Sequence, residues 1–167
     1  MHVGQNFPII ICSEVYASDG KNLLVFHRHP NNQWLPGKFV VPGGRVELDE
    51  DVLSGAIREV REETGIKIPK RIATLKAVVV HHEIIRKETF LVFIFFARFQ
   101  KTSKIPRSNN EGSAQWVPIK NIRKNGEEFP LIRHYLSNIV KRKNKIIFTS
   151  SDWRSGNLLK IHSWMES

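Results

Sequence analysis

Cysteine and long hydrophobic runs are nearly missing from this chain. Its 167 residues include one cysteine, Cys12, which excludes a disulfide framework and a zinc site built from several cysteines. The longest apolar run, FLVFIFFA at residues 90–97, has eight residues, whereas a membrane-spanning helix needs about 20. The first residues, MHVGQNFPIIIC, lack the positively charged start of a secretory signal. We therefore expect a cytoplasmic protein that has no contact with a membrane.

Length and composition indicate one globular protein. Hydrophobic residues make up 41% and charged residues 25%, which is ordinary for a folded domain. The charge is unevenly placed, because residues 1–66 hold six Lys/Arg and nine Asp/Glu, whereas residues 67–167 hold 20 and seven. The basic part has two interpretations that the composition leaves open: a bias towards solubility, and an affinity for anions.

Hydrophobic patterns predict strands and two helices. Expected strands are 7–16 and 22–27, which form a hairpin, then 38–41, 71–85, 88–99 and 114–119. Helices are expected at 49–64 and 130–140, and the segment after residue 140 has no assignment. Strands interspersed with helices predict an α/β or α+β architecture. We expect residues 1–140 to form the domain and the basic tail, 141–167, to pack on it.

The helix at 49–64 has the clearest signals. Val52, Leu53, Ala56 and Val60 form an apolar stripe at helical spacing. The acids at 49–51 are expected in its first turn, where the helix dipole favours negative charge. Gly65 is expected to end the helix.

Three glutamates on this helix predict a metal site. Glu59, Glu62 and Glu63 are spaced to share one helical face, where like charges repel each other. Two neighbouring arginines neutralise them only in part. Oxygen ligands without His or Cys suit Mg²⁺ or Mn²⁺, and the pair Gly43-Gly44 lets the backbone approach a ligand closely. An ordinary solvated acidic helix face is the alternative interpretation.

The segment GRVELDEDVLSGAIREVREETGI, residues 44–66, resembles the signature of the Nudix hydrolases, G-x5-E-x7-R-E-U-x-E-E-x-G-U with U a bulky aliphatic residue. All nine specified positions fit: Gly44, Glu50, Arg58, Glu59, Val60, Glu62, Glu63, Gly65 and Ile66. The preceding PGG and the later WVP at 116–118 are also typical of the family, so the resemblance covers roughly residues 5–140.

This resemblance implies a Nudix fold, a mixed β-sheet sandwiched between α-helices, and metal-dependent hydrolysis of a nucleoside diphosphate linked to a variable group. It implies Glu59, Glu62, Glu63 and the Gly44 carbonyl as ligands of Mg²⁺ or Mn²⁺. Glu59 or Glu62 is implied as the general base, and Arg58 as a catalytic-site residue paired with Glu50. Glu50 and Gly65 are structural positions of the motif. Glu111, on a loop before Trp116, is expected to act as a base or an extra metal ligand, with an ordinary loop carboxylate as the equal alternative.

Substrate choice depends on residues outside this motif. Arg28 is expected to approach the phosphates, and His81 and Trp34 to line the substrate pocket. Each of them also has a purely structural interpretation: Arg28 as a surface arginine, His81 as an exposed strand end and Trp34 as a buried core residue. The region 80–82 lacks the proline typical of ADP-ribose hydrolases and the tyrosine typical of dinucleoside-polyphosphate hydrolases. A nucleoside triphosphate, ordinary or oxidised, is the first expectation, and a nucleotide sugar of the GDP-mannose type is the second.

A function of another class follows from the basic part of the chain. The run KRKNK at 141–145 would anchor nucleic acid in an RNA 5′-end processing enzyme or a nucleic-acid-binding Nudix protein. No basic stripe interleaved with aromatic residues supports it, so we favour a small nucleotide as the partner. We expect a monomer or a homodimer.

Overall fold

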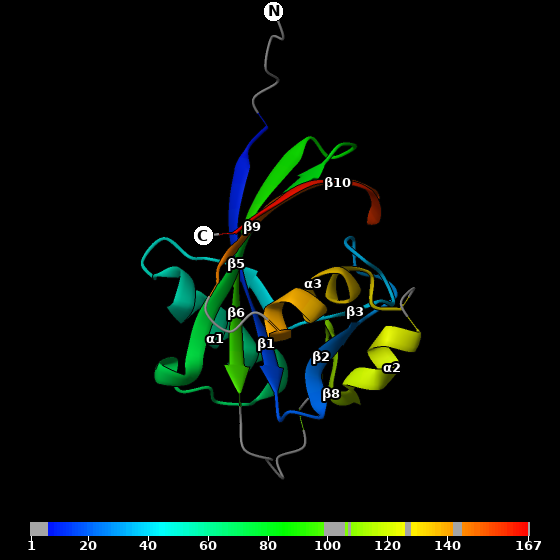
Figure 1. The fold of residues 1–167 in the computed structure, drawn as a ribbon. Coiled ribbons are helices and arrows are strands. Elements are labelled where there is room, and N and C mark those ends of the chain that lie inside the picture. Colours follow the sequence, from blue (N-terminus) through cyan, green and yellow to red (C-terminus); the bar gives the residue numbers. More distant parts are fainter. Residues whose placement is uncertain (1–6, 99–105, 107, 126–127, 142–144, 167) are drawn as a thin grey trace, which may run out of the picture.

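The computed structural model describes residues 7–98, 106, 108–125, 128–141 and 145–166, which form a mixed sheet with helices on both faces (Figure 1). The strands are β1 Ile9–Ser18, β2 Asn22–Arg28, β3 Phe39–Val40, β4 Gly43–Arg45, β5 Ala73–Glu83, β6 Glu88–Arg98, β7 Ser108–Asn109, β8 Gly112–Pro118, β9 Ile147–Arg154 and β10 Asn157–Glu166. The helices are α1 Val52–Thr64, the short 3-10 helix η1 Lys70–Ile72, α2 Ile119–Lys124 and α3 Pro130–Lys141.

Strand order in the sheet is β10-β9-β5-β6-β1-β2-β8-β7, with β3 paired to β2 and β4 paired to β1. The pairs β1 with β6 and β5 with β9 are parallel, and the other pairs are antiparallel. The predicted hairpin of the first two strands forms, with Ser18 opposite Leu23.

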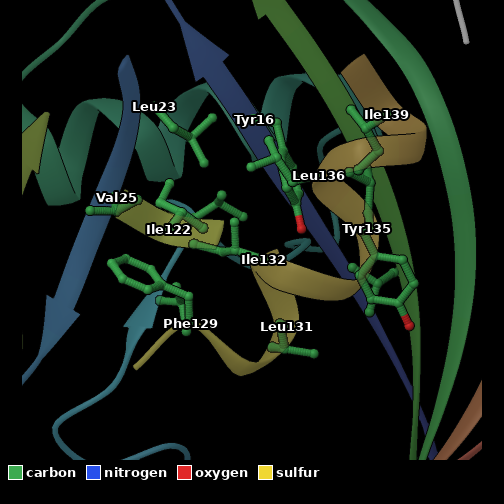
Figure 2. Close-up of a cluster of buried hydrophobic side chains, with 14 of the residues drawn as sticks. Tyr16, Leu23, Val25, Ile122, Phe129, Leu131, Ile132, Tyr135, Leu136 and Ile139 are labelled. Atoms are coloured by element: carbon green, nitrogen blue, oxygen red, sulfur yellow. The ribbon is translucent and has the colours of Figure 1, made fainter. Parts of the chain in front are cut away.

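Side chains that alternate along the central strands supply two cores. On one face, Val15 and Ala17 of β1 pack with Ala56 and Val60 of α1. On the other face, Tyr16, Leu23 and Val25 meet the apolar sides of α2 and α3. Figure 2 shows Ile122, Ile132 and Leu136 turned towards these strand residues, and all three are buried. The sheet is thus enclosed between α1 and the pair α2 and α3.

Helix α1 begins later than the sequence predicts. It starts at Val52, so the acids at 49–51 precede the helix, and the expectation that they occupy its first turn is wrong. Asp51 is the N-cap, and its carboxylate accepts hydrogen bonds from Leu53 N and Ser54 N, both at 2.9 Å. A capping carboxylate satisfies the free N–H groups of the first turn, which fixes the start of the helix at this residue. The helix ends as predicted, at Gly65 in the left-handed conformation with φ 71°.

Several elements differ from the sequence expectations. The strand expected at 71–85 ends at Glu83, and Ile84 and Ile85 belong with residues 86–87 to the turn between β5 and β6. The segments β4, β7 and α2 are not predicted by the sequence, and they are short, with three, two and six residues respectively. Short elements carry little periodicity, and their formation depends on neighbours distant in sequence.

The segment after residue 140 adds two strands to the sheet. Strand β9 runs parallel to β5, with Ala77 opposite Ile147 and Glu83 opposite Trp153, and β10 pairs with β9. The sequence left this segment unassigned because a strand with a parallel partner some 70 residues away has no local signature. The division of the chain at residue 140 stays a prediction.

Candidate active site

Arg58 holds the loop before α1 against the helix. Its guanidinium donates to both carboxylate oxygens of Glu50, at 2.7 and 3.1 Å, and to the carbonyl of Arg45 at 3.0 Å. These bonds join the residues before the helix to its middle. Such two-point contact between Arg and a carboxylate fixes geometry as well as charge. The pKa of Glu50 is lowered, chiefly by its hydrogen bonds from Arg58.

The same guanidinium contacts two of the three clustered glutamates. It donates to Glu59 at 2.9 Å and to Glu62 at 3.0 Å. The Glu62 side chain is half exposed, whereas Glu59 is largely covered. A Cβ added to Gly44 would lie 2.5 Å from a carboxylate oxygen of Glu59, so the lack of a side chain at Gly44 makes room for this carboxylate.

Glu63 is the buried member of the cluster, with 5% exposure. Its carboxylate accepts a hydrogen bond from Gly43 N at 3.0 Å. Burial raises the pKa of Glu63 to about 8, and the neighbouring charge of Glu59 adds to the rise. Burial also raises the pKa of Glu59, although Arg58 opposes the shift. Two carboxylates in such surroundings are disfavoured as anions unless a cation lies beside them.

The donor chemistry fits a hard divalent cation, because every candidate ligand is an oxygen. Within the described part of the chain, no three His, Cys, Asp or Glu side chains already converge on one point that would hold an ion. Two of the three clustered carboxylates, those of Glu59 and Glu62, instead contact the Arg58 guanidinium. Metal binding would therefore require the carboxylates to exchange this partner.

A cavity of about 300 Å³ lies beside the glutamates and shares Gly43 and Gly44 with them as a wall. Its other lining residues include Arg28, Trp34, His81, Arg86, Phe90 and Leu131. The Nε atom of Arg28 is buried and has no hydrogen-bond partner among the described residues. An unpaired buried donor is costly, so a ligand that accepts from Arg28 would be favoured here.

Sequence reasoning missed Glu14, which lines the same cavity. Burial raises the pKa of Glu14 to about 7, against the lowering effect of Arg28. The available signal was a single carboxylate within the apolar run IIICSEVYA of β1. Cys12, on the same strand, also lines the cavity, and burial raises the pKa of its thiol to about 12, so the thiol stays protonated.

Residues 7–136 of this chain match the sequence model of the NUDIX domain. The chain belongs to the Nudix family. The match covers most of the segment that the resemblance in sequence predicted, and it includes the whole of the glutamate helix α1. The recognition of the family from the motif at 44–66 is therefore confirmed.

Individual relatives share parts of the chain. A Nudix hydrolase of Bacillus subtilis named YvcI is 33% identical over 110 residues, 65% of each protein. The human m7GpppN-mRNA hydrolase NUDT17 is 38% identical over 56 residues, which are 34% of this chain but only 17% of that protein. An ADP-ribose pyrophosphatase of Methanocaldococcus jannaschii is 40% identical over 63 residues, 38% of this chain and 35% of that protein. The matched segments thus span less than two thirds of each relative.

Solved structures confirm the Nudix fold. A MutT protein from Bacillus halodurans superposes with a TM-score of 0.69 at 19% identity, covering 92% of this chain and 96% of that one. A MutT protein from Methanosarcina mazei gives 0.67 at 22% identity, over 85% and 100%. A bifunctional NMN adenylyltransferase/ADP ribose pyrophosphatase from Francisella tularensis, solved with AMP and a Mn ion, gives 0.62 at 17% identity, over 81% and 43%.

The three residues outside the motif that are expected to bind substrate all line one cavity. Arg28 ends β2, Trp34 lies in the loop that follows, and His81 lies near the end of β5. The alternative of an exposed strand end is wrong for His81, which is 5% exposed. Trp34 is partly buried, and its ring stacks on Phe90 at 6.1 Å between centroids.

Glu111 lies in the turn before β8 and is exposed. Burial is the main cause of the raised pKa values of Glu59 and Glu63, and the negative charge of Glu111 adds a smaller rise to both. Its backbone carbonyl accepts from His29 N and from Asn32 Nδ2, each at 2.8 Å, which fixes the loop after β2 to this turn.

Among the described residues, no helix is both long enough and apolar enough to cross a bilayer.

The metal-free protein will lose stability as the pH rises from 6.5 to 8. Burial raises the pKa of Glu63 from its ordinary value of 4.5 to about 8, so the folded state holds a proton that the unfolded state has released. For this one group the free energy of unfolding falls by up to about 2 kcal/mol over that range. Glu14 acts in the same direction up to about pH 7.

The opposing effect of His81 is small in this range. Burial lowers the pKa of His81 from 6.5 to about 3, so most of its gain in stability is complete at pH 6.5 and only about 0.4 kcal/mol remains above it. Urea unfolding in EDTA at the two pH values measures the change, and Glu63→Gln should weaken it. The same slope in Glu63→Gln and in the unaltered protein would show that Glu63 is not its source.

Proposed function

We propose that this Nudix protein is a metal-dependent hydrolase of nucleoside diphosphates linked to a further group, and that a nucleoside triphosphate is its substrate. The products are the nucleoside monophosphate and pyrophosphate. The observation that carries the proposal is the common wall of Gly43 and Gly44, which joins the glutamate cluster to the cavity. A nucleotide in this cavity would bring its phosphates to the carboxylates.

Glu59, Glu62, Glu63 and the Gly44 carbonyl would hold the metal, Mg²⁺ or Mn²⁺. The bound cation supplies charge neutralisation between carboxylates and phosphates, and it makes water more acidic. Glu59 or Glu62 takes the proton of the attacking water. The water oxygen forms the new bond to phosphorus while the bond to the leaving phosphate oxygen breaks. Arg28 donates from its buried Nε to a phosphate oxygen and stabilises the charge that develops there.

Arg58 and Glu111 have supporting roles in this proposal. Arg58 positions the loop through Glu50, and it would release Glu59 and Glu62 when these residues hold a metal. Glu111 is an additional base or metal ligand, supported by its electrostatic effect on Glu59 and Glu63. Gly65 ends the helix that carries the glutamates. The basic surface of the second part of the chain attracts polyphosphates from solution.

A substrate panel tests the proposal. It comprises ordinary and oxidised nucleoside triphosphates, nucleotide sugars, ADP-ribose, dinucleoside polyphosphates and 5′-triphosphate RNA, each with Mg²⁺, Mn²⁺ or EDTA. We expect pyrophosphate from at least one triphosphate with metal and none with EDTA. Turnover confined to nucleotide sugars or to RNA would replace the substrate assignment, and no turnover at all would refute the hydrolase.

Nucleic-acid binding stays an alternative prediction. The run KRKNK at 141–145 lies largely outside the described residues. The similarity to the mRNA hydrolase NUDT17 covers only 56 residues of this chain. A match of this length does not favour RNA over other substrates. Salt-sensitive binding of 5′-triphosphate RNA that weakens when Lys141, Arg142 and Lys143 become Ala would support it.

A further inference from the structure

Strand β9 reaches the cavity from outside the segment that matches the NUDIX domain. It spans Ile147–Arg154, whereas the family match ends at residue 136. In the parallel pair of β5 and β9, His81 lies opposite Ser151 and Glu83 lies opposite Trp153. His81 also lines the cavity. The C-terminal extension therefore contacts a cavity residue directly.

Hydrogen bonds join three buried side chains at this contact. Trp153 Nε1 lies 3.1 Å from His81 Nδ1 and 2.8 Å from Ser151 Oγ, and Ser151 Oγ lies 2.7 Å from His81 Nδ1. His81 is 5% exposed, and the other two are fully buried. The indole N–H of Trp153 can only donate, and it is shared between Ser151 Oγ and His81 Nδ1. A bare Nδ1 on His81 can accept from both the indole and the Ser151 hydroxyl, so this arrangement favours Nδ1 as the acceptor.

This set of bonds decides which atom of His81 carries the proton. A neutral imidazole has one N–H, and an accepting Nδ1 leaves that proton on Nε2. Burial lowers the pKa of His81 to about 3, so the ring is neutral at physiological pH. His81 thus offers a single donor, Nε2–H, rather than a charge.

Backbone contacts hold the extension in place. Ile84 N donates to the carbonyl of Trp153 at 3.0 Å. The fully buried carboxylate of Glu83 accepts from Ser155 N at 3.1 Å and from Gly156 N at 3.4 Å, in the turn after β9. The indole of Trp153 also meets Trp34 edge to face, with ring centroids 6.2 Å apart. Trp153 is therefore fixed relative to both β5 and the cavity wall.

The remaining wall suits a flat, apolar ring. Trp34 and Phe90 stack at 6.1 Å, and Val92 and Leu131 complete this side. A volume of about 300 Å³ lies at the lower end of ordinary ligand sites. Arg28, Arg45 and Arg86 also line the cavity, and His81 differs from them as an uncharged donor held in place by Trp153. A ligand that presents no acceptor to this buried donor leaves it unpaired, which weakens binding.

We propose that the cavity takes the nucleobase of the substrate, and that His81 selects a base carbonyl oxygen through its Nε2–H, with Trp153 as the positioning residue that fixes this tautomer. The inference rests on the proposed function for the identity of the ligand. It assigns to β9, outside the matched Nudix domain, a part in substrate selection. Keto-bearing bases are then preferred over bases that present an amino group at the same position.

Two matched pairs of nucleotides test the preference. IMP and AMP differ by a carbonyl against an amino group at one ring position, and so do UMP and CMP. Calorimetry with Mg²⁺ should give at least about tenfold tighter binding to the keto member of one pair, the ratio expected from one satisfied hydrogen bond. In Trp153→Phe and in His81→Phe the ratio should fall below about threefold. Trp116→Phe, on β8, removes an indole outside the cavity and should keep it.

The tautomer is measured independently of any ligand. Nitrogen NMR of histidine-labelled protein, assigned by the signals lost in His81→Phe, should show a protonated Nε2 and a bare Nδ1 in the unaltered protein. Trp153→Phe should populate both tautomers, whereas Ser151→Ala, which retains the indole donor, should keep the original one. Equal affinity within both nucleotide pairs, absence of binding, or a proton on Nδ1 would overturn the inference. Because monophosphate binding and NMR need no turnover, a failed hydrolysis panel would be distinguishable from a failure of this inference.

Discussion

Glu63→Gln will lower the rate of metal-dependent hydrolysis at least about 100-fold, the scale seen when one electrostatic group of an active site is removed. Glutamine has nearly the same shape and keeps an oxygen that can accept from Gly43 N. It carries no charge, so the proposed metal loses an anionic ligand. Turnover of the best panel substrate at a series of Mg²⁺ concentrations measures the effect, and Glu62→Gln should give the same direction of change.

The matched control is Glu128→Gln. Glu128 is exposed and lies outside both the glutamate cluster and the cavity. The rate of hydrolysis by Glu128→Gln should equal that of the unaltered protein. Thermal unfolding of Glu63→Gln separates chemistry from folding, because neutralising a carboxyl that burial already disfavours as an anion should not destabilise the metal-free fold at pH 8. Full activity in both Glu62→Gln and Glu63→Gln would remove these residues from the mechanism.

Gly43→Ala will reduce both stability and activity. A Cβ at this position would lie 2.5 Å from the Ser13 carbonyl oxygen and 2.8 Å from the Glu14 Cα, both of which are backbone atoms that cannot rotate away. Overpacking of this kind costs about 1–3 kcal/mol. The strand β4 must then shift from β1, which moves the Gly43 N–H from Glu63 and the Gly44 backbone from Glu59. We expect at least about 100-fold lower activity, as for loss of a positioned polar group.

Gly37→Ala is the comparison for this variant. No atom lies within 4 Å of a Cβ at Gly37, although its φ of 65° makes a side chain strained. Its cost should stay near 1 kcal/mol, from backbone conformation alone. Urea unfolding measures both variants. An unchanged unfolding midpoint in Gly43→Ala would mean that β4 can separate from β1 without loss.

Local signals predicted helix α1 well. The end of α1 follows from Gly65, and the contact of Glu50 with Arg58 accords with the family motif. The start was misplaced because Asp51 is a capping residue, and acids at a helix start look alike whether they cap it or belong to it.

Features that depend on distant partners could not be read from the sequence. Glu14 lines the cavity together with Arg28 and Gly43. These residues lie close together only after β1 has paired with other strands of the sheet. The burial of His81 depends on Trp153, 72 residues away. The assembled sheet sets the register of β9 against β5. This register decides that Trp153, rather than a neighbouring residue, contacts His81.

The parallel pairing of β5 with β9 also governs how the chain can be shortened. A fragment trimmed to the family-matched segment, residues 7–136, would leave β5 as an edge strand from Ala77 to Glu83, with its backbone N–H and C=O groups open. An uncovered edge of this length invites pairing between molecules. Such a fragment would tend to aggregate even with every residue of the Nudix motif intact, so limited proteolysis and expression trials should retain the C-terminal hairpin.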